Sequence, residues 1–114
     1  MSDIVWSYRD TTWSQDRDLV GYDVEATDGS IGRIDEASAE ATGQWLVVDT
    51  GFWIFGKRRL VPAGVVTGVD HDARTVLVSM SKDEIKDAPD YDESGWNEDA
   101  RTRHTHYYTP FTGM

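Results

Sequence analysis

The chain lacks cysteine, contains only three prolines and has no long apolar run. Without cysteine it has no disulfide bridge, no thiolate nucleophile and no zinc or iron–sulfur centre with cysteine ligands. A membrane-spanning helix needs roughly 20 consecutive apolar residues, and the first residues lack the basic-then-apolar order of a secretory signal. We therefore expect a cytoplasmic protein.

Basic residues are also scarce, because 11 lysines and arginines stand against 21 aspartates and glutamates and give a formal net charge of −10. Nucleic-acid binding depends on basic side chains that displace phosphate counterions, so this charge disfavours direct nucleic-acid binding. The length of 114 residues leaves room for one small domain and for no second core of ordinary size.

Short apolar runs separated by turn signals fill the middle of the chain, from about residue 19 to residue 80. The turn signals recur about every 8–12 residues, a spacing typical of small barrels and sandwiches. The sequence predicts an all-β fold with five or six antiparallel strands. The strand candidates are residues 19–26, 31–38, 44–50, 65–70 and 74–80.

Turn residues predict how these strands pair. Asp28 and Gly29 favour a two-residue hairpin, since glycine adopts positive φ without steric cost, and Gly43 favours a second turn. Residues 70–73 separate the last two runs, which we expect to pair antiparallel, with aspartate bonding to its own backbone in the turn. Non-alternating runs such as 46–48 and 76–78 indicate strands covered on both faces.

A short helix is expected at the end of this core. Ser81 and Glu84 have the spacing of a capping box, in which both side chains bond to free amides of the first helical turn. Pro89 disfavours helical backbone in the residue before it, so the helix should end near Asp87 or Ala88.

Residues 1–18 and 89–114 lack strand patterning, yet they carry eight of the aromatic residues. Disordered tails are usually poor in aromatics, so we expect these arms to dock. Their own barrel and a partner's barrel are equally consistent as docking surfaces, and a mobile solvated tail remains an alternative for the last ten residues or so. The candidate docking residues are Trp6, Trp13, Trp96, Tyr107, Tyr108 and Phe111.

The core resembles the PRC-barrel family, named after the cytoplasmic part of the photosynthetic reaction centre H subunit. The resemblance divides the chain into an arm at 1–17, a barrel domain at 18–92 and a second arm at 93–114. It implies a small, bent antiparallel barrel that serves as an adaptor, without a shared catalytic constellation or an obligatory cofactor. The residues that carry it are Leu19–Val24, Asp28–Asp35, Trp45–Gly51, Arg59–Pro62 and Ser81–Pro89.

One loop is more aromatic than the family pattern implies, and three basic residues follow its aromatic residues. Aromatic anchors beside arginine are typical of interaction hot spots, so this loop is a candidate interaction surface. Alternatively, it closes the barrel with its aromatics in the core and its cations paired to nearby acids; membrane or RNA contact is less favoured. The candidate residues are Phe52, Trp53, Phe55, Lys57, Arg58 and Arg59.

Sequence motifs for metal binding or catalysis are weak. His104 and His106 could face one way on a strand and bind a metal, but a solvated tail explains them better, so we assign no metal site. The sequence contains no nucleophile elbow, phosphate-binding glycine loop or zinc-protease motif. We therefore expect no enzyme activity and no cofactor.

Together these features predict a non-catalytic protein-interaction or assembly module that forms a homodimer. A barrel this small buries little core alone, which favours self-association. The resemblance also implies an alternative, since a barrel of this family is also found as the second domain of a ribosome maturation factor. That alternative is a ribosome- or RNA-processing accessory factor that binds a basic protein.

Overall fold

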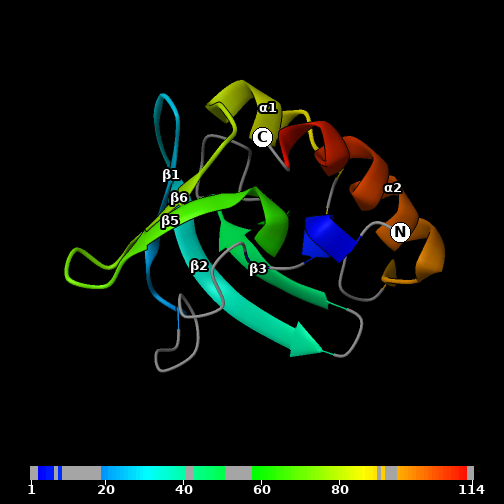
Figure 1. Ribbon diagram of the computed structural model, residues 1–114, viewed down its shortest axis with the longest axis horizontal. Helices are drawn as coiled ribbons and strands as arrows, with labels where there is room; N and C mark the ends of the chain where they lie inside the picture. The colour runs from blue at the N-terminus through cyan, green and yellow to red at the C-terminus, as the bar shows by residue number, and fades with distance from the viewer. Residues whose placement is uncertain are drawn as a thin grey trace.

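The computed structural model describes residues 3–6, 8, 19–40, 43–50, 58–89, 91 and 95–112. Their backbone forms a six-stranded sheet with helices on one side (Figure 1). The strands are β1 (Asp23–Ala26), β2 (Gly29–Glu40), β3 (Gly43–Asp49), β4 (Arg58–Pro62), β5 (Val66–Asp70) and β6 (Thr75–Val78). The helices are α1 (Lys82–Lys86) and α2 (Glu98–Tyr108), with 3-10 turns η1 (Asp3–Trp6), η3 (Ala63–Val65) and η5 (Thr109–Phe111).

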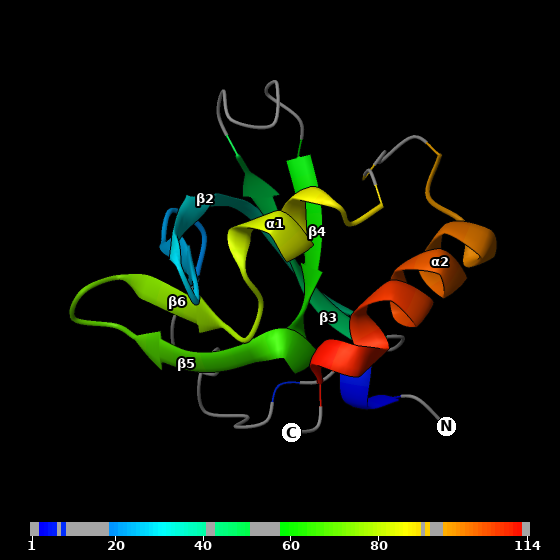
Figure 2. The same cartoon turned by 90° about the horizontal axis from the view of Figure 1, so that it is seen from above.

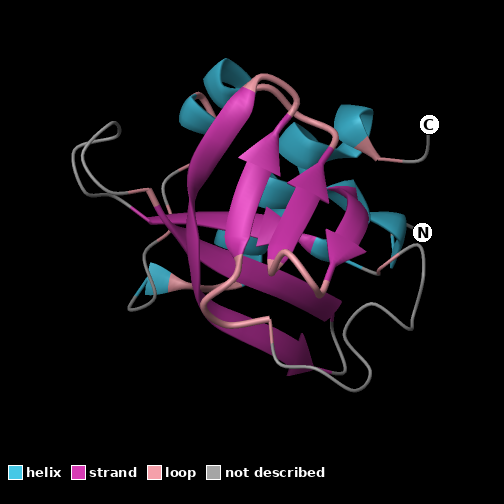
Figure 3. Ribbon diagram, turned by 90° about the vertical axis from the view of Figure 1, so that its left-hand side faces the viewer, coloured by secondary structure: helices cyan, strands magenta, loops and turns pink. Residues whose placement is uncertain are grey.

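The strand order across the sheet is β4-β3-β2-β1-β6-β5. The two edge strands β4 and β5 are joined directly by η3, so the sheet curls into a half-barrel (Figures 2 and 3). The predicted small β-barrel is confirmed. One pairing differs from the all-antiparallel expectation: β1 and β6 are parallel, because β6 returns from the β5 hairpin in the direction of β1.

The predicted hairpins are present. Ala26 pairs with Gly29, so the β1–β2 turn consists of Thr27 and Asp28, one residue earlier than expected. In the β5–β6 turn the Asp70 carboxylate accepts hydrogen bonds from the backbone amides of Asp72 and Ala73, both at 3.0 Å. This side-chain bonding to the local backbone is the turn chemistry that the sequence predicts.

Helix α1 also matches its prediction. The Glu84 amide donates to the Ser81 hydroxyl at 3.2 Å, and the Ser81 amide donates to the Glu84 carboxylate at 2.8 Å. These two bonds form the expected capping box.

Helix α2 was not expected from the sequence. Asn97 caps its start, because the Asn97 side-chain oxygen accepts a hydrogen bond from the Ala100 amide at 2.9 Å. Its buried face consists of Ala100, His104 and Tyr108, spaced four residues apart. This stripe gives little apolar periodicity, since alanine and histidine are weak hydrophobic signals, so tertiary packing holds the helix.

The core lies between the curled sheet and the two arms. On β3 the four successive residues from Trp45 to Val48 are all buried, which confirms a strand covered on both faces. The same expectation for residues 76–78 is wrong: Val76 and Val78 are buried, whereas Leu77 is 42% exposed. Strand β6 therefore has one solvent-facing side.

Candidate interaction surface

The N-terminal arm packs on the chain's own barrel. The Trp6 ring lies edge-on to Trp45 at 5.8 Å between centroids and to Trp96 at 6.3 Å. Its indole N–H donates to the Thr105 hydroxyl at 2.9 Å, and the Arg101 guanidinium lies 4.5 Å from the centre of the ring. Trp6 thereby connects β3 with α2.

The C-terminal arm packs on the same barrel. Tyr108 is fully buried and its hydroxyl donates to the Leu60 carbonyl oxygen on β4 at 2.6 Å. Burial raises the pKa of Tyr108. The Tyr107 hydroxyl donates to the Glu84 carbonyl oxygen, and the Phe111 ring lies 5.8 Å from the Tyr107 ring. Of the candidate docking residues, only Trp13 lies outside the described residues.

His104 and His106 lie on helix α2, so they do not share a strand face. His104 is 1% exposed, with its ring 5.2 Å from Trp96 and 6.2 Å from Tyr108. Its Nδ1 hydrogen donates to the Ala100 carbonyl oxygen at 2.7 Å, while Nε2 has no hydrogen-bond partner among the described residues. Burial lowers the pKa of His104, which keeps the ring neutral. His106 is exposed, and the described residues contain no group of three or more metal-binding side chains.

The basic loop residues separate in the structure. Phe52, Trp53, Phe55 and Lys57 lie outside the described residues. The Arg58 guanidinium bonds to the carboxylates of Asp35 at 2.9 Å and Glu36 at 3.1 Å.

Arg59 does not contribute to an exposed surface, since it is only 4% exposed. Its guanidinium donates to the carbonyl oxygens of Ile85 at 3.2 Å and Lys86 at 3.0 Å. These are carbonyls at the end of α1, where helical carbonyls lack intrahelical partners, so Arg59 ties α1 to β4. Successive residues of a strand point to opposite faces, which separates Arg59 from Arg58.

The register across β1, β2, β3 and β4 forms an arrangement that no local motif indicates. Asp23 pairs with Arg33, Arg33 with Asp49, and Asp49 with Arg58. Directly paired residues project to the same face, about 4.8 Å apart. We call these four residues the charge row; along it, negative and positive side chains alternate.

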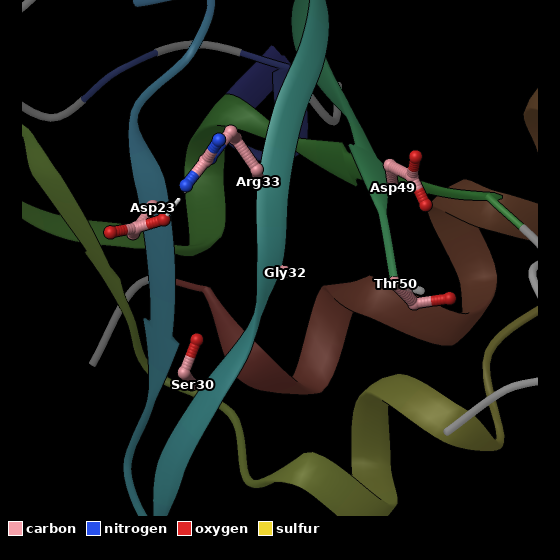
Figure 4. A pocket seen from close by; sticks show the side chains of 6 residues that line it. All are labelled: Asp23, Ser30, Gly32, Arg33, Asp49 and Thr50. Atoms are coloured by element: carbon pink, nitrogen blue, oxygen red, sulfur yellow. Dashed lines mark hydrogen bonds and ion pairs between the residues drawn. The ribbon is translucent and has the colours of Figure 1, made fainter. Parts of the chain in front are cut away.

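A shallow cavity of about 380 Å³ lies along the charge row. Figure 4 shows the Arg33 side chain turned toward Asp23, at 3.5 Å, with Asp49 on the opposite side of the cavity. The remaining lining residues are Ser30, Gly32 and Thr50. Carboxylates, a guanidinium and hydroxyls at an open surface suit hydrogen bonding to a polar partner surface.

Gly32 allows the strands to approach at this place. Its φ is 149°, and a Cβ atom there would lie 2.1 Å from the Asp49 carbonyl oxygen. Any other residue would push β3 away from β2. The charge row could not be predicted from the sequence, because it depends on the register of distant strands.

The sequence matches no known protein family, and no curated protein is significantly similar to it. A solved structure from Pseudomonas aeruginosa, described as a candidate 16S ribosomal RNA processing protein, RimM, aligns with a TM-score of 0.48 and 24% identity. The alignment covers 62% of this chain and 44% of that chain, so this chain corresponds to less than half of that protein. No helix in the described residues is both long and apolar enough to cross a membrane.

Proposed function

We propose that this chain is a non-catalytic, cytoplasmic protein-interaction module of the PRC-barrel type, and that it forms a homodimer through the charge row. The alternation of charge along Asp23, Arg33, Asp49 and Arg58 is the observation that carries this proposal. The described aromatic residues of the arms support it indirectly. They pack in or against the chain's own core, so they are not available as a dimer contact.

An alternating row of four charges is complementary to its own reversed copy. A two-fold axis between β2 and β3 sets Arg33 of one copy against Asp49 of the other, and Asp23 against Arg58. Such a mutual contact is what a symmetric dimer interface requires. Arg58 is held by Asp35 at 2.9 Å and Glu36 at 3.1 Å, whereas the contact of Arg33 with Asp23 is longer, at 3.5 Å. We therefore expect the central pair of Arg33 and Asp49 to contribute most.

Exposed ion pairs contribute about 0–1 kcal/mol each and are screened by salt. We therefore expect a weak dimer that dissociates as the ionic strength rises. Sedimentation velocity over a dilution series, at low and at high salt, measures this dependence directly.

Two charge reversals test the geometry. Arg33→Glu and Asp49→Lys should each yield a monomer. In a two-fold dimer the contact between positions 33 and 49 occurs two times, so each substitution creates two repulsive contacts at the centre of the interface. An equimolar mixture of the two variants should form a heterodimer, since Glu then faces Lys. A wild-type monomer at every concentration contradicts self-association. A dimer that persists in both single variants would show that the chain self-associates through another surface than the charge row.

A second candidate function is an accessory factor in ribosome or RNA processing that binds a basic protein. It is favoured by the acidic side chains around the exposed Leu77. Leu77 pairs with Glu25 on β1 and with Gly68 on β5, and Asp70 is the last residue of β5. The net charge of −10 adds a long-range attraction for a basic partner.

The variant Glu25→Lys tests this second function. It should lose salt-sensitive binding to basic small-subunit ribosomal proteins, whereas Asp83→Lys on α1 should retain it. Equal binding by all three proteins contradicts this surface. Direct RNA binding by the unaltered protein, lost on replacing Lys57 and Arg58 with glutamate, would instead assign the contact to the loop.

A further inference from the structure

Helix α2 carries a second open surface, on the opposite side of the molecule from the β5–β6 hairpin (Figure 1). A shallow groove of about 430 Å³ lies between α2 and the segment that follows α1. Its lining residues are Pro89, Thr102, Arg103, His106 and Tyr107. We call it the α2 groove.

The floor of the α2 groove is apolar and held in place. The Tyr107 hydroxyl donates to the Glu84 carbonyl oxygen, and the Tyr107 ring lies 5.3 Å from the buried Tyr108 ring. Pro89 faces it from the chain segment after α1. A fixed aromatic ring and a proline form a surface on which an apolar side chain can pack without ordering flexible groups.

The rim of the α2 groove is basic. Arg103 lies four residues before Tyr107 and three before His106, so all three share one side of the helix. Arg103 and His106 are both exposed. A guanidinium on this rim can form two parallel hydrogen bonds with one carboxylate.

Arg103 differs from the other arginines whose contacts are known. Arg33 and Arg58 pair with carboxylates, and Arg59 bonds to carbonyl oxygens. Arg101 lies over the Trp6 ring and Arg74 over the Tyr22 ring. The Arg103 guanidinium makes no ion pair or hydrogen bond with any residue that the structure describes. The exposed Arg103 guanidinium is therefore available to an external anion.

We propose that the α2 groove binds a short peptide segment in which one carboxylate side chain stands next to an apolar residue. The carboxylate pairs with Arg103, and the apolar side chain packs on Pro89 and Tyr107. Charge complementarity at the rim and the apolar floor together select this occupant. The groove is open, so an extended segment buries more of it than a small anion does.

The surrounding charges set the orientation of this segment. Burial, followed by the carboxylates of Asp87 and Glu84, raises the pKa of Tyr107. The α1 end of the groove is therefore negative, and the ligand carboxylate lies at the Arg103 end. The net charge of −10 repels highly acidic peptides and phosphate chains, which favours a segment with a single acidic residue.

Fluorescence anisotropy with two labelled peptides tests the proposal on the full chain. The probes are Gly-Ser-Leu-Asp-Phe-Ser-Gly and its counterpart with asparagine in place of aspartate, both with blocked ends. An exposed ion pair contributes up to about 1 kcal/mol, so the aspartate peptide should bind up to about fivefold more tightly than the asparagine peptide.

Arg103→Gln should abolish the preference for aspartate and leave the melting temperature unchanged, because the side chain is exposed. Arg74→Gln, at the exposed end of the β5–β6 turn, is the matched control and should retain the preference. Equal binding of the two peptides, no binding of either, or an unaltered preference in Arg103→Gln overturns the proposal. Displacement by inorganic phosphate at equal concentration, or preferential binding to anionic phospholipid vesicles, also overturns it in favour of a phosphate ligand.

Discussion

The indole N–H of Trp6 donates a hydrogen bond to the hydroxyl oxygen of Thr105 at 2.9 Å, across 99 positions of the sequence. The same Thr105 hydroxyl donates to the Arg101 carbonyl oxygen at 2.9 Å. This contact joins the first described turn of the chain to its last α-helix. The two arms therefore cover β3 as one connected unit.

Thr105→Val should lower the free energy of unfolding by about 1–3 kcal/mol, the cost of leaving a buried donor unpaired. Trp6 is 2% exposed, so water cannot replace the lost acceptor. Denaturant unfolding followed by tryptophan fluorescence measures the change. Thr102→Val on the exposed side of α2 is the control and should have little effect; equal losses in both variants would indicate a general effect of valine on the helix.

Removal of residues 90–114 should lower the melting temperature and expose apolar surface on β3 and β4. The deleted segment contains Tyr108 and Trp96, which pack on the barrel. Removal of residues 1–18 should act in the same direction, because Val5, Trp6 and Tyr8 are buried. Calorimetry and binding of a hydrophobic dye report both effects. Unchanged melting in both truncated chains would show that the arms contribute nothing to the fold.

Acid should destabilise the fold through His104. The folded-state pKa of His104 is lowered by burial, with Arg103 and Arg59 acting in the same direction, from an unfolded value of about 6.5. Below that value the unfolded chain binds a proton that the folded chain excludes. Stability is therefore highest above pH 6.5 and falls as the pH decreases, by at most about 1.4 kcal/mol per pH unit for this group.

His104→Phe should flatten this dependence between about pH 5 and pH 7, since phenylalanine keeps an aromatic ring between Trp96 and Tyr108 and does not titrate. Urea unfolding at a series of pH values provides the comparison. An unaltered slope in His104→Phe would assign the acid sensitivity to other groups.

Gly32→Ala should destabilise the protein by more than about 2 kcal/mol, because the new methyl group meets the Asp49 carbonyl oxygen at 2.1 Å and φ is 149°. Gly68→Ala is the matched control. A Cβ atom there would lie 3.5 Å from the Leu77 side chain, an ordinary contact. The two variants should differ clearly in thermal unfolding, and similar melting temperatures would contradict the close approach of β2 and β3.

Several features were determined by the sequence alone. Asp70 forms its turn and Ser81 and Glu84 form their capping box because each depends on hydrogen bonds within four residues of the chain. The β1–β2 hairpin likewise follows from local turn chemistry, although its turn begins one residue earlier than predicted. Short-range interactions of this kind are readable from neighbouring residues.

Other features were decided by the tertiary structure. Helix α2 forms where Ala100, His104 and Tyr108 bury against the barrel, and its own pattern of apolar residues is weak. Adjacent Arg58 and Arg59 separate because strand geometry sends one to solvent and the other beneath α1. The charge row exists only because β1 to β4 pair in one register. Register is set by the combined packing of the whole core, which no short segment of sequence contains.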